Sequence, residues 1–275
     1  GEGAWAMGYS EPGAGSDLAN LSMRAELDGD QYILNGSKIW TSDATICDYI
    51  FVLVRTSPDK PKHEGISLIL VDMNQPGVKV SPIKLISGAS PFCETHFDNA
   101  IAPATDLIGG VDRGWTVGKR LLQFERSTHA GINISGSQGG RSEKSEMPSL
   151  VSKYVGRQDG QLADSDLRQR LTQFEMNAHA QRITQRRAIE ELQSRAPGFT
   201  SSAVKLTNAL NIQEGDELLV AAMGPQGFRW DPETADGEEL ASLQKWLYQK
   251  SLTIAGGTKE VQLNIIAKRV LGLPD

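Results

Sequence analysis

A glycine-rich stretch near the start of the chain contains residue types that suit phosphate binding. Residues 7–17 have the sequence MGYSEPGAGSD, in which glycines and a serine follow the end of an expected strand. Such residues allow backbone N–H groups and a hydroxyl to approach a phosphate closely. A loop of this composition is more often a plain turn, so it indicates a phosphate site only where a second feature supports it.

A second segment supplies a side chain that a flat aromatic cofactor would contact. Residues 32–42, YILNGSKIWTS, predict a strand that ends with Trp40, Thr41 and Ser42. A tryptophan and two hydroxyls at a strand end suit such a cofactor, whereas a strand tryptophan taken alone more often packs in a core. The two segments together favour a cofactor site.

The pair EPGAGSD and NGSKIWTS resembles the paired signature of the acyl-CoA dehydrogenase middle domain. The similarity continues through ETHFDN (residues 94–99), Gly114-Trp115 and LLQFER (residues 121–126), and ends with TIAGGTKEVQLNIIAKRVLGLP (residues 253–274). It therefore spans almost the whole chain. The resemblance implies FAD as cofactor, an acyl-CoA thioester as substrate, and an electron-transfer flavoprotein as electron acceptor. It also implies a homo- or hetero-oligomer, either a dimer or a tetramer.

The family's binding residues can be carried onto the positions of this sequence that match its motifs. The resemblance implies cofactor contacts from both N-terminal segments and from the C-terminal one, with Ser42 as the contact to flavin N5. These cofactor residues are Met7, Tyr9, Ser10, Gly15, Ser16, Trp40, Thr41, Ser42, Thr258 and Glu260. The implied substrate contacts are Ser16, Phe124, Arg126 and Gly256. No metal is expected, because the four histidines are too scattered for a ligand set.

The catalytic base departs from the commonest family pattern. Many members carry a carboxylate immediately before the Gly-Thr pair of the C-terminal segment, where this chain has Gly256. A second branch places its base beside an arginine on the first helix after the β-domain, and Glu125-Arg126 matches that arrangement. The resemblance thus implies that Glu125 removes the α-proton while the β-hydrogen leaves as hydride to flavin N5. The alternative for Glu125 is a solvated or salt-bridged helix residue.

A second departure lies between Gly140 and Gly160, where the Arg-x-x-Phe-Gly segment that grips flavin across the family's subunit interface is missing. Three hypotheses therefore stay open. The first is an FAD-dependent acyl-CoA dehydrogenase. The second is a non-catalytic or half-site subunit whose homologous partner completes a shared site. The third is an acyl-CoA oxidase-like relative that passes electrons to oxygen, or a relative that acts on non-CoA substrates.

Two hydrophobic patterns predict two domains that would carry these residues. Up to about Asp106, short runs bounded by turn residues predict an antiparallel β-sandwich or barrel with a tight hairpin at Asp28-Gly29-Asp30. After Gly109-Gly110, helical spacing predicts a four-helix-type bundle with helices over 167–192, 240–254 and 259–270. We expect an α+β chain with a β-domain at 1–110 and a C-terminal helical domain at 111–275.

Composition excludes some functions. The net charge of −6 gives no basic field for nucleic acid, and no apolar run reaches the roughly 20 residues that span a bilayer. Two cysteines without metal-ligand spacing favour a reduced, cytoplasmic chain. Because the chain starts just before the first flavin motif, we expect the family's N-terminal helical domain to lie outside it, on a longer chain or on another polypeptide.

Overall fold

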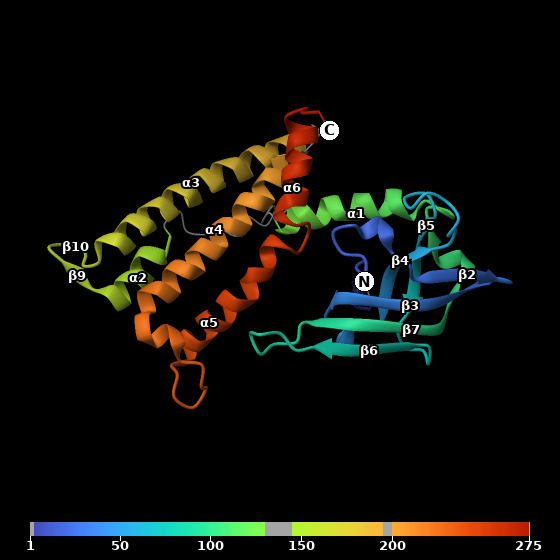
Figure 1. Cartoon of the computed structure of the whole chain (residues 1–275), viewed down its shortest axis with the longest axis horizontal. Coiled ribbons are helices and arrows are strands. Elements are labelled where there is room, and N and C mark those ends of the chain that lie inside the picture. Colours follow the sequence, from blue (N-terminus) through green and yellow to red (C-terminus); the bar gives the residue numbers. More distant parts are fainter. Residues whose placement is uncertain (1–2, 130–144, 195–199, 275) are drawn as a thin grey trace. The chain divides into compact units, whose positions relative to one another are not determined.

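The computed structural model describes residues 3–129, 145–194 and 200–274, without the side chains of 123–129 and Leu192. The chain divides into two compact units, Gly1–Gln123 and Phe124–Asp275. The first unit carries the large sheet and the beginning of helix α1 (Gly114–His129), and the second is mainly helical (Figure 1). A sheet followed by helices confirms the predicted fold class.

Within the described residues, the strands of the first unit form one eight-stranded sheet. They are β1 (Trp5–Gly8), β2 (Arg24–Asp28), β3 (Gln31–Ser42), β4 (Tyr49–Arg55), β5 (Ile66–Asp72), β6 (Val78–Ile83), β7 (Phe92–Pro103) and β8 (Leu107–Ile108). The order is β6-β7-β3-β2-β4-β5-β8, with β1 added to β4. Most neighbours are antiparallel as predicted, but β1–β4 and the short β2–β4 pairing are parallel.

The sheet folds over a shared core and is sandwich-like. Leu34 of β3 and Phe97 of β7 are buried in the same cluster as Val52 of β4 and Ile69 of β5. In Figure 1, β4 and β5 run steeply across β3 and β7. The other face of β4 carries Leu53, which packs with the first turns of α1. Strands β4 and β5 are therefore apolar on both faces.

The predicted hairpin is present between β2 and β3. Asp28 pairs with Gln31, so Gly29 and Asp30 form a two-residue turn. Gly29 has φ of 62° at the first turn position, where glycine avoids the cost that a side chain would meet. The hairpin sets the start of β3 and hence the place along the sheet where its motif residues fall.

The second unit is built around helix α4 (Thr200–Met223), which packs against the other described helices of that unit. Figure 1 shows the same arrangement. Those helices are α2 (Met147–Val155), α3 (Ser165–Gln193), α5 (Gly237–Gln249) and α6 (Lys259–Ile265), which continues as a π-helical turn over Ile266–Val270. A small hairpin, β9 (Arg157–Gln158) and β10 (Gln161–Leu162), precedes α3. Short 3-10 turns lie at Leu18–Asn20, Ala44–Ile46, Ala104–Asp106, Gly224–Phe228 and Lys250–Thr253. No described helix is long and apolar enough to cross a membrane.

Helix α5 begins three residues before its predicted start, because a capping residue precedes it. The Asp236 carboxylate accepts hydrogen bonds from the backbone N–H groups of Glu238 and Glu239 at 2.9 and 3.3 Å. These bonds satisfy donors that the first turn of a helix leaves free. Residues 237–239, which precede the predicted start, therefore form the first turn of α5.

Gly114 lets α1 start directly on the sheet. A Cβ at this position would lie 2.2 Å from the carbonyl carbon of Ser67 and 2.6 Å from the amide nitrogen of Leu68. Both contacts are with backbone atoms of β5, which have no rotamer through which to move aside. The helix can therefore approach β5 this closely only with glycine at its first residue.

Gly114→Ala should lower the free energy of unfolding by about 1–3 kcal/mol, the usual cost of overpacking. Gly237→Ala is the matched control, because Gly237 also opens a helix but has no atom within 4 Å of an added Cβ. That control should stay within about 1 kcal/mol of the unmodified protein, on the stabilising side. Urea unfolding of both variants measures the difference, and equal effects would contradict the close approach.

Candidate functional site

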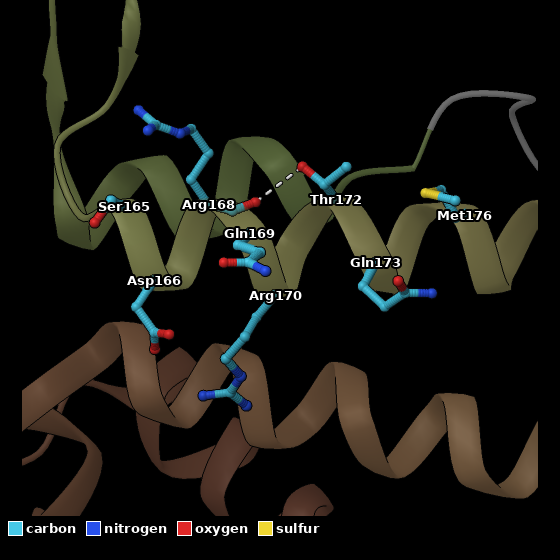
Figure 2. Close-up of a pocket in the computed structure, with 8 residues that line it drawn as sticks. All are labelled: Ser165, Asp166, Arg168, Gln169, Arg170, Thr172, Gln173 and Met176. Carbon is cyan, nitrogen blue, oxygen red and sulfur yellow. Dashed lines mark hydrogen bonds between the residues drawn. The ribbon is translucent and has the colours of Figure 1, made fainter.

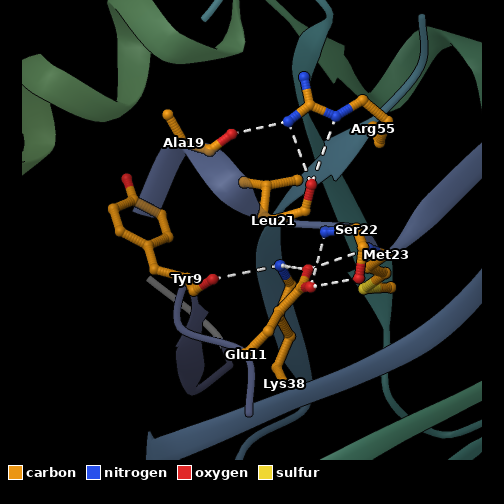
Figure 3. Close-up of polar contacts among 8 residues, drawn as sticks. All are labelled: Tyr9, Glu11, Ala19, Leu21, Ser22, Met23, Lys38 and Arg55. Carbon is orange, nitrogen blue, oxygen red and sulfur yellow. Dashed lines mark hydrogen bonds and ion pairs between the residues drawn. The ribbon is translucent and has the colours of Figure 1, made fainter. Parts of the chain in front are cut away.

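A buried ion pair joins the glycine-rich loop to strand β3 (Figure 3). Lys38 Nζ lies 2.7 Å from Glu11 Oε1, and the two side chains are 0% and 5% exposed. Lys38 Nζ also donates to the backbone carbonyl of Tyr9 at 3.2 Å. Each charge thus has a partner, as a charge in a low-dielectric interior requires.

The same carboxylate closes the loop that begins at Glu11. Glu11 Oε2 accepts hydrogen bonds from the backbone N–H and the hydroxyl of Ser22 at 2.7 and 3.0 Å, and Oε1 accepts from the Met23 N–H at 3.0 Å. Ser22 and Met23 lead into β2, so Glu11 fixes both ends of the loop. Arg55 holds its middle by donating to the carbonyls of Ala19 and Leu21 at 2.7 and 3.1 Å (Figure 3).

Burial and mutual attraction act together on the pKa values of this pair. Burial lowers the pKa of the Lys38 amine from 10.5 to about 8, a shift that Glu11 opposes and Arg55 reinforces. Burial alone would raise the pKa of Glu11. The Lys38 charge and the hydrogen bonds from Lys38, Ser22 and Met23 outweigh it and hold that pKa below 4.5. Glu11 is therefore ionised at neutral pH.

Trp40 lies in a β-bulge near the end of β3. Lys38 pairs with Thr95 and Thr41 with Cys93, so three steps along β3 match two steps along β7. One extra residue is accommodated at positions 39 and 40. Trp40 there has φ of 62°, a left-handed conformation that a bulky side chain rarely adopts.

The bulge turns Trp40 and Ser42 outward and leaves Thr41 inside. Trp40 is 54% exposed, with its ring edge-on to Phe92 at 6.2 Å between centroids, and Ser42 is exposed as well. Thr41 is fully buried, and its hydroxyl accepts a weak hydrogen bond from Thr95 at 3.4 Å. Core packing therefore does not explain Trp40. A cofactor contact by Thr41, which stays a prediction, would have to come from its backbone.

The predicted cofactor residues of the first segment differ in their exposure to solvent. Tyr9 is buried and Met7 and Ser10 are half-buried, whereas Gly15 and Ser16 are exposed. The Ser10 carbonyl accepts a hydrogen bond from the Ile39 N–H at 2.9 Å, next to the bulge. The structure thus brings the first segment and the Trp40 segment together, and the contacts of either segment with a cofactor stay predictions.

The C-terminal segment forms a glycine turn in the helical unit. Gly256 and Gly257 have φ of 64° and 98°, and the Thr258 hydroxyl caps α6 by accepting from the Val261 N–H at 3.2 Å. The buried Lys205 amine donates to the carbonyl of Gly257 at 2.6 Å. The exposed Glu260 follows in the first turn of α6. Contacts of Gly256, Thr258 and Glu260 with a ligand stay predictions.

Glu125, Phe124 and Arg126 lie on α1, but their side chains fall outside the part of the chain that the structure describes. The base and these two substrate contacts therefore stay predictions. Among the described residues, no three His, Cys, Asp or Glu side chains gather as a metal ion would require.

A surface hollow of about 810 Å³ lies along the first turns of α3 (Figure 2). Its lining residues are Ser165, Asp166, Arg168, Gln169, Arg170, Thr172, Gln173 and Met176. Arg168 donates to Gln161 Oε1 at 2.6 Å, and Arg170 donates to Glu214 Oε1 at 3.2 Å. Because α3 supplies every lining residue, the hollow is an open helix face, and we assign it no chemistry.

Glu11 and Lys38 support the candidate site, and the sequence motifs contain both residues without singling them out. Both stand inside the matched segments, where the glycines, the tryptophan and the hydroxyls drew the assignment. One signal in the sequence could have found Lys38. It lies two positions before Trp40 and an even number of positions after Tyr32 and Leu34, so alternation along the strand places all three side chains inward. A lysine at such a position needs a buried acid as partner.

Comparisons with known proteins match the whole chain to one family. Residues 6–100 match the family model of the acyl-CoA dehydrogenase middle domain, and residues 112–271 match that of the acyl-CoA dehydrogenase C-terminal domain. Acyl-CoA dehydrogenase IpdE1 of Mycobacterium tuberculosis is 38% identical over 270 residues, which cover 98% of this chain and 67% of that protein. Acyl-CoA dehydrogenase FadE34 of the same species is 35% identical over 278 residues, 100% of this chain and 36% of that protein.

Solved structures are similar over the same length. The Tcur3481-Tcur3483 steroid ACAD has a TM-score of 0.82 and 30% identity, covering 98% of this chain and 68% of that one. The ChsE4-ChsE5 complex from Mycobacterium tuberculosis has a TM-score of 0.78 and 26% identity, covering 98% and 69%.

Trp40→Gly should leave the free energy of unfolding within about 1 kcal/mol of the unmodified protein, because relief of the left-handed strain offsets the lost contacts. Trp5→Gly is the matched control: Trp5 is also half-exposed in a strand, stacked on Tyr49 at 4.8 Å, but without positive φ. That change should cost about 0.5–3 kcal/mol. Chemical denaturation measures both, and an equal loss in the two variants would rule out strain at Trp40.

Acid should destabilise the protein partly through Glu11. Its folded-state pKa lies below the ordinary 4.5, so the unfolded chain binds the proton more tightly, and stability falls as the pH drops through that range. Urea midpoints between about pH 7 and about pH 3 should therefore fall more steeply for the unmodified protein than for Glu11→Gln. Glu26→Gln, an exposed change on β2, should keep the steep profile. Parallel profiles for all three proteins would contradict the assignment.

Proposed function

This chain belongs to the acyl-CoA dehydrogenase family, as its motifs predicted, and we propose that it catalyses FAD-dependent α,β-dehydrogenation of an acyl-CoA thioester. Family membership makes it an enzyme of the oxidoreductase class. One observation carries the proposal. The outward Trp40 and Ser42 stand at a strained bulge, and the Glu11–Lys38 ion pair fastens a glycine loop to the same strand.

The described residues of the β-domain fit a flavin. Trp40 offers an exposed apolar plane and Ser42 a hydroxyl on the same outward side. Gly13 and Gly15 have open space where a Cβ would stand, so phosphate oxygens can reach the backbone of the loop. We assign Trp40 and Ser42 to the ring, with Ser42 at N5, and residues 7–16 to the rest of the cofactor. When bound, FAD supplies the acceptor for the hydride that leaves the β-carbon.

Glu125 is our candidate for the base. A carboxylate accepts the α-proton only within hydrogen-bonding reach, and a water-poor pocket raises its pKa toward the operating pH. Glu125 stands beside Arg126 on α1, the first helix after the β-strands. At the other family position, Gly256 has φ of 64°, so a glutamate there would be strained. This backbone favours a base elsewhere, and Glu125 meets that need.

The substrate proposal includes thioesters with ring-bearing acyl groups, because a structural neighbour at 30% identity is a steroid ACAD. We propose an electron-transfer flavoprotein as the electron acceptor. For the assembly we propose a dimer or tetramer, and a homologous second subunit belongs among its forms because the ChsE4-ChsE5 neighbour is a complex of two named chains.

Visible spectroscopy of the purified protein tests cofactor and chemistry together. The protein should take up FAD stoichiometrically, and anaerobic addition of its substrate should bleach the flavin band. The panel should contain straight-chain, branched and steroid-derived acyl-CoAs. Rapid reoxidation by oxygen would instead favour an oxidase, and a monomer by light scattering that held stoichiometric flavin would contradict the oligomer.

Glu125→Gln should retain FAD and ligand binding but reduce the flavin about 10²–10⁴-fold more slowly, the usual contribution of a positioned base. The amide is nearly isosteric with the carboxylate but cannot accept the proton. Glu190→Gln, an exposed change on α3, is the control and should reduce flavin at the normal rate. Anaerobic stopped-flow measures both. An unchanged rate in Glu125→Gln would eliminate this base, and no reduction in the unmodified assembly would favour a non-catalytic subunit.

A further inference from the structure

Two buried side chains near the end of β3, Lys38 and Thr41, lie only three positions apart, and we call them the inward anchors. Residues directly opposite in an antiparallel pair share a face of the sheet. Lys38 faces Thr95 and Thr41 faces Cys93, and all four side chains are buried. A regular strand alternates faces, so residues three apart would point to opposite sides. The strand must therefore contain one extra residue between Lys38 and Thr41.

The bulge falls where these anchors allow it. Upstream of Lys38, the inward side chains of β3 are Tyr32, Leu34 and Lys38, an even spacing. The register shift between Leu34 and Gly36 adds its extra residue to β7 and therefore leaves the alternation of β3 unchanged. If Lys38 pointed outward, Ile39 and Thr41 would both point inward without a bulge at Trp40, and the extra residue would lie nearer the hairpin. The inward position of Lys38 thus decides that Trp40 takes the left-handed conformation.

Lysine is an improbable residue for an inward anchor unless an acid holds it there. Glu11 is the acid, at 2.7 Å, and the Tyr9 carbonyl is the second acceptor. The other charged group that acts on the Lys38 amine is Arg55, which repels it. Without the Glu11 charge, a cationic Lys38 gains by moving toward water.

We propose that Lys38, held inward by Glu11, is a positioning residue that places the β-bulge at Trp40 and so orients the Trp40 ring and the Ser42 hydroxyl toward the flavin. The orientation of the bulge is a property of the cofactor-free protein, whereas its use for flavin rests on the proposed function. A separate measurement therefore addresses each part.

The experiment compares Glu11→Gln with the double variant Glu11→Gln/Lys38→Met. The single variant leaves a cationic lysine without its counter-charge. The double variant restores an inward apolar anchor, and neutral replacement of a buried ion pair is often tolerated. Protein labelled with 5-fluorotryptophan gives a ¹⁹F signal for each of the five tryptophans, with Trp40 assigned through Trp40→Phe. FAD titration gives the cofactor affinity of each variant.

At pH 6, Glu11→Gln should shift or broaden the Trp40 signal alone and weaken FAD binding at least about tenfold, equivalent to about 1.4 kcal/mol. The double variant should restore both. Raising the pH to 9 should also return the Trp40 signal in Glu11→Gln, since a neutral amine no longer favours water. The control is the exposed pair one strand away, Arg24→Met/Glu26→Gln, which should change neither signal nor affinity.

The other outcomes decide either the whole proposal or one of its two parts. An unmoved Trp40 signal in Glu11→Gln at pH 6 overturns it. A double variant as impaired as the single one also overturns it, because Glu11 would then act by closing the loop alone. If Glu11→Gln does not fold but the double variant folds with a normal Trp40 signal, the unpaired lysine is the cause and the proposal stands. If the unmodified protein binds no FAD, the proposed function fails, and the ¹⁹F signal alone decides the role of Lys38.

Discussion

The buried ion pair between Glu11 and Lys38 is the interaction on which the geometry of the candidate flavin site depends. The Glu11 carboxylate binds Lys38 of β3 and the backbone N–H groups of Ser22 and Met23, which lead into β2. One residue therefore closes the loop and ties it to the sheet. Neither charge is stable in the interior alone. The loop can consequently expose Gly13, Gly15 and Ser16 and still keep one conformation, because its fixed points lie in the core.

The same contacts hold Trp40 in a strained backbone conformation. A left-handed tryptophan costs free energy, and it persists only where its neighbours leave no alternative. Here the neighbours are two inward side chains, Lys38 and Thr41, separated by a number of residues that a regular strand cannot accommodate. An exposed, strained aromatic ring contributes little to folding. Its exposure leaves the ring open to the ligand contact that we propose.

The helical unit contains a second left-handed turn, again next to a buried lysine. Gly256 and Gly257 both occupy left-handed backbone, and the Lys205 amine donates a hydrogen bond to the carbonyl of Gly257. The turn demands glycine where many relatives carry their catalytic carboxylate. A side chain at position 256 would be strained in this backbone, which agrees with the proposal that Glu125 on α1 is the base.

The sequence by itself determined the family, the order of strands before helices and the β2–β3 hairpin. These depend on local patterns: alternation, helical spacing, and Gly29 in the two-residue turn between β2 and β3. The tertiary structure alone decided which motif residues face outward. Alternation placed Trp40 on the same side as Lys38, and only the register between β3 and β7 shows the extra residue that separates them. The partnership of Glu11 with Lys38 was equally hidden, because the two residues are 27 positions apart in sequence and only folding brings the two charges into one desolvated space, where each becomes necessary to the other.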